Sequence, residues 1–169
     1  MTKEKIKDIY FYEKPEVHIR VIEDTDPDKI KNQKKQYPFE LYNTVDVYII
    51  TDYRKFNFII PKGYTWNGAD IPRVFWRMIG SRTDNDFLIA SMLHDYLLEF
   101  KVYIINEVLK NKITKNEYRR LTSLIFREKI KKQGTNVIKA NIMSWFVDLF
   151  QIINYKQWES VKWIYPPNL

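Results

Sequence analysis

The chain has 169 residues, of which 45% are apolar and 16% aromatic, which suits one packed domain and excludes disorder throughout. It contains no cysteine, which excludes disulfides, thiolate catalysis and cysteine-ligated zinc. The formal net charge of +7 is uneven, since residues 101–140 hold eleven Lys and Arg against three Glu.

Residues 16–60 are predicted to form strands separated by a polar loop. Residues 16–23 alternate apolar and polar side chains, as in a strand with one wet face. Residues 24–36 are polar and basic with one proline, and they predict a surface loop. Residues 39–50 and 55–60 are rich in β-formers and predict an antiparallel hairpin.

The second half is predicted to be helical. A short helix is expected over residues 72–79, and a central one over residues 86–100, which are apolar almost all round. The sequence TKNE, starting at Thr114, is a capping box for a helix that runs to Gly134, and a last helix is expected from Val137 to about Ser160. We therefore predict a single α+β domain with a small antiparallel sheet followed by about four helices packed on it.

Neither membrane insertion nor export is expected. The charged start MTKEKIKDIYFY has no apolar stretch of the kind a signal peptide needs. The most apolar late run, residues 142–153, is too short to span a bilayer and contains Asp148. We expect a protein of the cytoplasm of the cell that makes it.

A loop and a helix hold the candidate chemistry. The segment from Phe58 to Arg73, FIIPKGYTWNGADIPR, combines Gly, Pro and Asn-Gly steps into a specified loop. Neighbouring helix residues diverge by about 100°, so His94 and Asp95 are not expected to pair side by side, but both can reach the loop.

Two interpretations of these residues remain open. Asp70, His94 and Asp95 could converge with Asn67 as ligands of a divalent metal or as an acid-base pair. Alternatively, His94 and Asp95 hold the loop to the core through hydrogen bonds. The candidate catalytic residues, if the protein is an enzyme, are His94, Asp95 and Asp70, and the candidate binding residues in the loop are Trp66, Asn67 and Arg73.

The same motif resembles a known family. An apolar strand, Pro-x-Gly-aromatic, Gly-Ala-x-Ile-Pro-Arg and a helix with Leu-His-Asp-Tyr-Leu are similar to the phage and prophage domain of unknown function 1353, over roughly the middle half of the chain. That resemblance implies a phage-encoded protein of undefined biochemistry. The matching positions are Pro61, Gly63, Gly68, Ala69, Ile71, Pro72, Arg73, His94, Asp95 and Tyr96.

This chain departs from the family pattern at three positions. Family members usually carry an aspartate where this chain has Asn67 and a serine where it has Asp70, and a later aspartate falls near Ser123. With fewer anionic ligands than the family pattern supplies, we expect a metal-free protein with no cofactor.

The basic stretch and the C-terminal end suggest partners. Arg119, Arg120, Arg127 and Lys131 could contact phosphate, but a solvated helix face explains them as well, so we expect only weak binding to nucleic acid. The aromatic segment 145–169 suggests a contact surface for another protein or a second copy, and the alternative is that it closes over the domain's own core.

Three functions are therefore considered. The first is a phage accessory protein that acts by protein–protein contact, in the host cytoplasm during infection or in the virion or tail. The second is a small metal-assisted hydrolase, directed at cell wall or nucleic acid, that uses Asp70, His94 and Asp95. The third is a basic nucleic-acid-binding protein.

Overall fold

Six strands form two small antiparallel sheets in a computed structural model that describes residues 4–68 and 85–153. The larger sheet has the order β1-β4-β5, from β1 (Ile6–Phe11), β4 (Val45–Thr51) and β5 (Lys55–Ile60). The smaller has the order β2-β3-β6, from β2 (Val17–Ile19), β3 (Phe39–Leu41) and β6 (Thr65–Trp66). With the helices that follow, this confirms the predicted α+β fold.

The hairpin β4–β5 supplies most of the core surface of the larger sheet. Val45, Val47 and Ile49 alternate inward along β4, where Val47 pairs with Phe58 and Ile49 with Phe56. These five side chains are buried, as the alternating pattern predicts. The predicted hairpin is confirmed over residues 45–60. The predicted first run starts too early, because residues 42–44 interrupt it and residues 39–41 pair instead in the smaller sheet.

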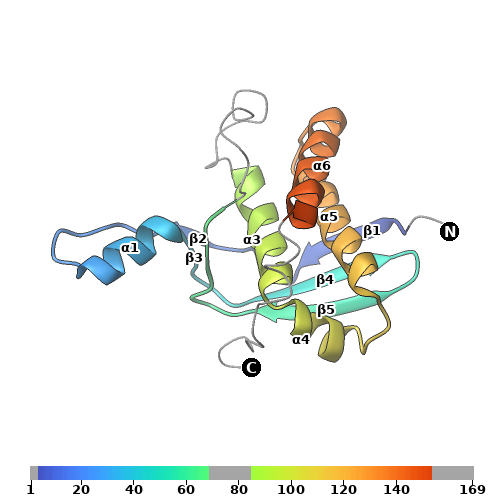
Figure 1. The fold of residues 1–169 in the computed structure, drawn as a ribbon, viewed down its shortest axis with the longest axis horizontal. Helices are drawn as coiled ribbons and strands as arrows, with labels where there is room; N and C mark the ends of the chain where they lie inside the picture. Colours follow the sequence, from blue (N-terminus) through green and yellow to red (C-terminus); the bar gives the residue numbers. More distant parts are fainter. Residues whose placement is uncertain (1–3, 69–84, 154–169) are drawn as a thin grey trace.

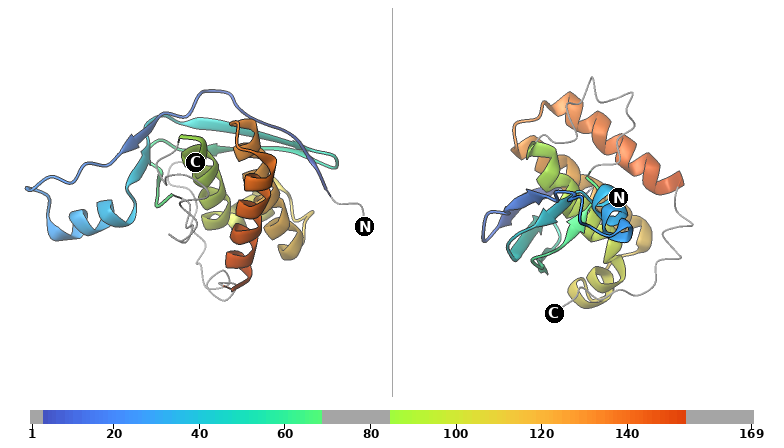
Figure 2. Two further views of the ribbon diagram at one scale, coloured as in Figure 1. Left: turned by 90° about the horizontal axis from the view of Figure 1, so that it is seen from above. Right: turned by 90° about the vertical axis from the view of Figure 1, so that its left-hand side faces the viewer.

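The long helices lie together on one face of the larger sheet (Figures 1 and 2). They are α3 (Asn85–Glu99), α5 (Lys115–Lys132) and α6 (Val137–Ile153), and α5 contacts β1, α3 and α6. A short helix, α4 (Lys101–Tyr103), and a π-helical turn, η2 (Ile104–Val108), connect α3 to α5 and were not predicted. None of the described helices has the length and apolarity that crossing a bilayer requires.

Helix α3 is the centre of the molecule, as its apolar sequence predicts. Tyr96 stacks on Phe58 of the sheet, with ring centroids 5.6 Å apart, and its hydroxyl donates to the Ile59 carbonyl at 2.7 Å. The Tyr118 hydroxyl of α5 also donates to the carbonyl of Leu97 in α3, at 2.6 Å. The helix is therefore fixed to the sheet and to α5 by hydrogen bonds as well as by packing.

The start and end of α5 follow their sequence signals. Thr114 accepts from the backbone N–H of Glu117, whose carboxylate accepts from the Thr114 backbone, so the predicted capping box is confirmed. Gly134 follows the helix with φ of +98°, a conformation that favours glycine. Helix α6 begins at Val137 as predicted. The predicted helix over 72–79 and the end of the last helix near residue 160 fall outside the described residues.

The predicted loop at residues 24–36 is wrong in its second half, where α1 (Asp28–Gln36) forms. Asp28 in the first turn and Lys34 and Lys35 in the last complement the helix dipole, and Lys34 pairs with Asp26 at 2.7 Å. None of its residues is buried, so an apolar periodicity could not reveal it. The helix lies at the surface, at the end of the molecule away from α6 (Figure 1).

Replacing Thr114 by alanine should lower the free energy of unfolding by about 1 kcal/mol, because an exposed N-terminal amide loses its cap. Urea unfolding followed by circular dichroism measures this change. Asn116→Ala, in the same exposed turn, is the control and should change stability by less than about 0.5 kcal/mol. Equal midpoints for the two variants would show that the capping box contributes nothing.

Candidate functional site

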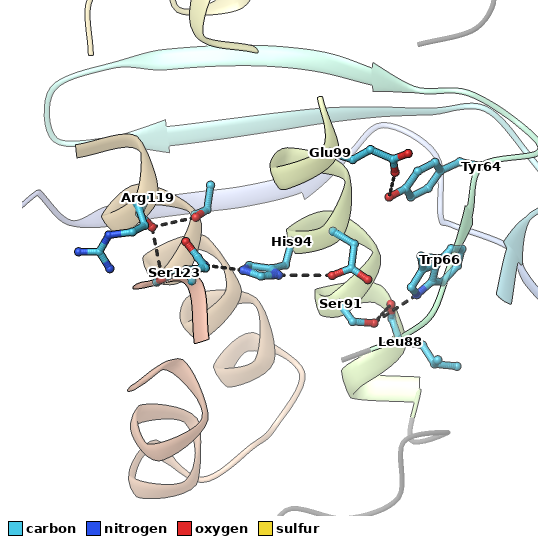
Figure 3. A network of polar contacts seen from close by, with 11 residues as sticks. Tyr64, Trp66, Leu88, Ser91, His94, Glu99, Arg119 and Ser123 are labelled. Atoms are coloured by element: carbon cyan, nitrogen blue, oxygen red, sulfur yellow. Dashed lines mark hydrogen bonds and ion pairs between the residues drawn. The ribbon is translucent and has the colours of Figure 1, made fainter. Parts of the chain in front are cut away.

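A polar stripe on α3 holds the described part of the predicted loop. Ser91, Asp95 and Glu99 follow one another at spacings of four residues and therefore share one face of α3. The Trp66 indole N–H donates to the Ser91 hydroxyl at 3.2 Å, and the Tyr64 hydroxyl donates to a carboxylate oxygen of Glu99 at 3.1 Å (Figure 3). The loop is thus joined to α3, through partners other than His94.

The pKa values of Glu99 on this stripe and of its partner Tyr64 are both raised. Withdrawal from water, together with the nearby negative charge of Asp95, raises the pKa of Glu99, and the hydrogen bond from Tyr64 opposes the rise. Burial, followed by the charges of Asp95 and Glu99, raises the pKa of Tyr64 well above its usual value. The Tyr64 hydroxyl therefore stays protonated and acts as a hydrogen-bond donor.

His94 faces the other two long helices. Its Nδ1 lies 3.4 Å from Oδ1 of Asp95, and its Nε2 lies 2.8 Å from the side-chain nitrogen of Gln151 in α6. An amide nitrogen can only donate, so Nε2 accepts and Nδ1 carries the proton, directed at Asp95. The expectation that His94 and Asp95 cannot pair side by side is wrong, because Nδ1 of His94 and Oδ1 of Asp95 come within 3.4 Å, at the limit of a hydrogen bond.

The contact between α5 and α6 continues this network. Ser123 of α5 lies between Asp148 and Gln151, with its hydroxyl 3.2 Å from the Asp148 carboxylate and 3.4 Å from the Gln151 amide nitrogen. Arg119 forms an ion pair with Asp148, and the Ser144 hydroxyl donates to the Ser123 carbonyl at 3.1 Å. We call this set the polar seam, and its members are His94, Arg119, Ser123, Ser144, Asp148 and Gln151.

The polar seam fastens helices to one another rather than presenting a reactive group. Both ring nitrogens of His94 have protein partners, and its side chain is buried against Phe126, with ring centroids 5.6 Å apart. A metal or a substrate at Nε2 would have to displace Gln151. Across residues 4–68 and 85–153, no three His, Asp or Glu side chains gather into a metal-binding group. The side-chain oxygen of Gln151 is buried without a hydrogen-bond partner among the described residues. Its lost hydrogen bonding to water lowers the free energy that the polar seam contributes to stability.

The remaining sequence-predicted residues are only partly described. Asp70 and Arg73 lie outside the described residues, so their convergence with His94 stays a prediction. Trp66 is 1% exposed and is part of the core, and Asn67 is partly buried. At Ser123, where the resemblance implies a carboxylate, this chain has a hydroxyl, and a carboxylate comes from Asp148 on α6 instead.

The prediction missed three important participants, although each had a signal. Ser144, Asp148 and Gln151 are spaced by four and three residues within an otherwise apolar run, so they share one face of α6. A polar stripe inside an apolar helix predicts a buried hydrogen-bonded contact. The spacing of Ser91 and Glu99 on α3 carried the same information for the loop.

Several basic side chains of α5 have partners within the protein. Arg127 and Lys131 both pair with Glu128, at 2.9 and 3.0 Å, and Lys132 pairs with Asp8 of β1. Lys129 lies over the ring of Phe11, 4.3 Å from its centroid. Arg120 is exposed. Most of these side chains therefore contact the protein itself, which favours a solvated, internally paired face over a phosphate-binding one.

Comparison with known proteins places the chain in a family. The family described as Protein of unknown function (DUF1353) matches residues 43–147, which run from the hairpin through α3 and α5 into α6. The chain belongs to this family. It is also 36% identical over 52 residues to an uncharacterized protein, y4jT, of Sinorhizobium fredii. That match covers 31% of this chain but only 16% of the relative, so the chain spans a small part of the relative's length. No solved structure shows a significant match.

Replacing Gln151 by methionine should lower the free energy of unfolding by about 1–3 kcal/mol, because His94 and Ser123 lose a buried donor while volume is nearly kept. Chemical denaturation measures the change. Gln33→Met, on the exposed α1, is the matched control and should alter stability by less than about 0.5 kcal/mol. If the two variants unfold at the same denaturant concentration, the polar seam does not stabilise the helix packing.

A second prediction concerns Lys129. Burial, with repulsion from Lys132, lowers the pKa of Lys129 to about 8, and Asp8 opposes part of the effect. An unfolded lysine titrates near 10.4, so between about pH 8 and pH 10.4 the unfolded chain binds more protons and this residue makes stability rise with pH. Lys129→Met removes that contribution. The unfolding free energy of wild type minus that of the variant should therefore increase from pH 7.5 to pH 10, and a constant difference would contradict the assignment.

Proposed function

We propose that this chain is a phage-encoded accessory protein that acts by protein–protein contact, with the outer face of α6 as its docking surface. The single observation that carries the proposal is that α6 is apolar on two opposite faces. Within residues 4–68 and 85–153, the second apolar face does not take part in the packed core.

The inner face of α6 already satisfies the requirements of the fold. Ala140 and Met143 are buried in a cluster with Phe126, and Val147 packs against it. The polar seam follows this face along the same helix. A helix that covers a small domain needs one apolar stripe, so the inner side accounts for the packing of α6 on α5.

The outer face has a second apolar stripe that reaches solvent. Ile138 is 71% exposed, Trp145 60% and Ile152 50%, and Ile142 and Leu149 lie between them and are partly exposed. We call this set the outer stripe, and its members are Ile138, Ile142, Trp145, Leu149 and Ile152. Contiguous exposed apolar side chains mark interaction sites, and tryptophan is among the residues that contribute most to binding.

Trp145 is positioned as an anchor for such a contact. The ring of Phe146 contacts the Trp145 ring edge to face, with centroids 5.0 Å apart, so the orientation of the indole is restricted in the free protein. An aromatic side chain whose orientation is already restricted loses little conformational entropy on binding, so less of the binding free energy is lost. The partner proposed is another phage protein or a second copy, in the host cytoplasm during infection or in the virion or tail. The phage setting is what the sequence resemblance of the loop and of the His94 helix to a phage and prophage family implies.

The two alternative functions have less support from the described residues. For the hydrolase, His94 is enclosed and both its ring nitrogens are engaged. For the nucleic-acid binder, Arg127, Lys131 and Lys132 are paired with acids of the same chain. The outer stripe, by contrast, is an exposed apolar surface that does not pack in the core formed by the described residues.

Replacing Trp145 by glutamate should abolish association while the fold persists, because a charge replaces the anchor of an exposed apolar stripe. The measurement is an immunoblot of purified particles made by the phage or prophage that encodes the chain, with wild type and variant compared. We expect the variant's signal to fall at least tenfold. Tyr53→Glu is the matched control, since Tyr53 is a similarly exposed aromatic, at 57%, on the β4–β5 turn.

Thermal melts of both variants establish that the fold is kept. A wild-type protein that is absent from particles would defeat the virion and tail role. Incorporation of Trp145→Glu at the wild-type level would show that the outer face of α6 is not the docking surface.

A further inference from the structure

We infer that the outer stripe pairs with the outer stripe of a second copy of the same chain, with the two α6 helices antiparallel about a twofold axis at Trp145. This inference rests on the proposed role of the outer stripe as a contact surface and specifies its occupant.

The spacing of the outer stripe is that of a helix that pairs with another helix. From Ile138 to Ile152 its five members are separated by four, three, four and three residues. This is the alternation of a and d positions in a heptad repeat, which keeps an apolar seam facing a partner helix.

The outer stripe is also nearly the same in both directions along the helix. Ile138 and Ile152 lie seven residues to either side of Trp145, and Ile142 and Leu149 lie three and four residues from it. When a second α6 is turned about an axis through Trp145, Ile138 meets Ile152, Ile142 meets Leu149, and Trp145 meets itself. A twofold interface requires this self-complementarity, because the same patch serves on both copies.

The charges beside the outer stripe are compatible with this arrangement. The stripe itself carries no ionisable side chain. In the antiparallel register Asp148 comes opposite the exposed Asn141 of the other copy, which can donate a hydrogen bond to it, and Asp148 already pairs with Arg119. The one other charge on α6 (Val137–Ile153), Lys139, comes opposite the apolar C-terminal end of the second helix, so no like charges of the described α6 residues meet. Antiparallel helices also place opposite ends of their dipoles together.

The test begins with the mass of the purified full chain by size-exclusion chromatography with light scattering. Wild type should elute with twice the monomer mass of 20.6 kDa, and Trp145→Glu, which puts two carboxylates on the axis, should elute as a monomer. Tyr53→Glu should remain dimeric, and circular dichroism melts show whether each variant is folded.

Cysteine cross-linking then tests the register, because the natural chain has no cysteine to interfere. In the antiparallel pair, Ile138→Cys of one copy faces Ile152→Cys of the other. Oxidation of a mixture of these two single variants should therefore give a covalent dimer that contains one of each, whereas each variant alone should give little. A parallel pair predicts the opposite, with each single variant cross-linking to itself.

The outcomes separate this inference from the proposed function. A wild type that is monomeric at every concentration overturns the self-pairing. If its incorporation into particles nevertheless depends on Trp145, the outer stripe docks a different protein and the proposed function stands. A dimer that persists in Trp145→Glu, or that cross-links in the parallel pattern, also overturns the inference.

Discussion

The burial of most of α3 is the constraint on which the rest of the structure depends. A buried polar side chain cannot be left without a partner, since an orphaned buried donor or acceptor costs about 1–3 kcal/mol. The buried Ser91 therefore determines where Trp66 of the loop segment can lie, and the buried His94 determines which face of α6 must approach. Glu99, at the exposed end of the helix, accepts the hydrogen bond of the buried Tyr64. Tyr96 fixes the sheet on the remaining side. The few polar groups of α3 thus fix the positions of the loop, α6 and the sheet around it, which apolar contacts alone would not specify.

Helix α6 shows how one sequence meets three different environments. Its inner side packs on α5, its polar seam joins α5 and α3, and its outer stripe faces solvent. The polar seam matters for the outer stripe as well, because Asp148 and Gln151 fix the rotation of α6 about its own axis. A helix held only by apolar contacts could roll and bury Trp145 in place of Met143. The buried hydrogen bonds exclude that alternative and keep the outer stripe outside.

Local patterns revealed much of the fold and less of the site. The hairpin, the capping box at Thr114 and the central helix were predictable. Their signals, which are alternation, a cap and all-round apolarity, depend only on residues close together in the sequence. Helix α1 was not, since a fully exposed helix has no apolar period. The seam was harder still: the pairing of His94 with Gln151 joins residues 57 apart, and spacing along one helix cannot say which other helix it meets. The partnership of Asp148 with Ser123 needed the packing of α5 on α6 for the same reason.

Helix α1 has a consequence for how the chain opens in solution. It buries no side chain and is held by Lys34, which bonds Asp26 and the Val21 carbonyl, and by Lys31, which bonds the Asp24 carbonyl. Nine residues with so few tertiary contacts can melt without disturbing the core, so local unfolding there costs far less than global unfolding. Amide hydrogens of α1 should accordingly exchange with deuterium long before those of α3, and protease should cut within α1 before it cuts within α3. The same independence makes this helix a natural place for inserted sequence in related chains.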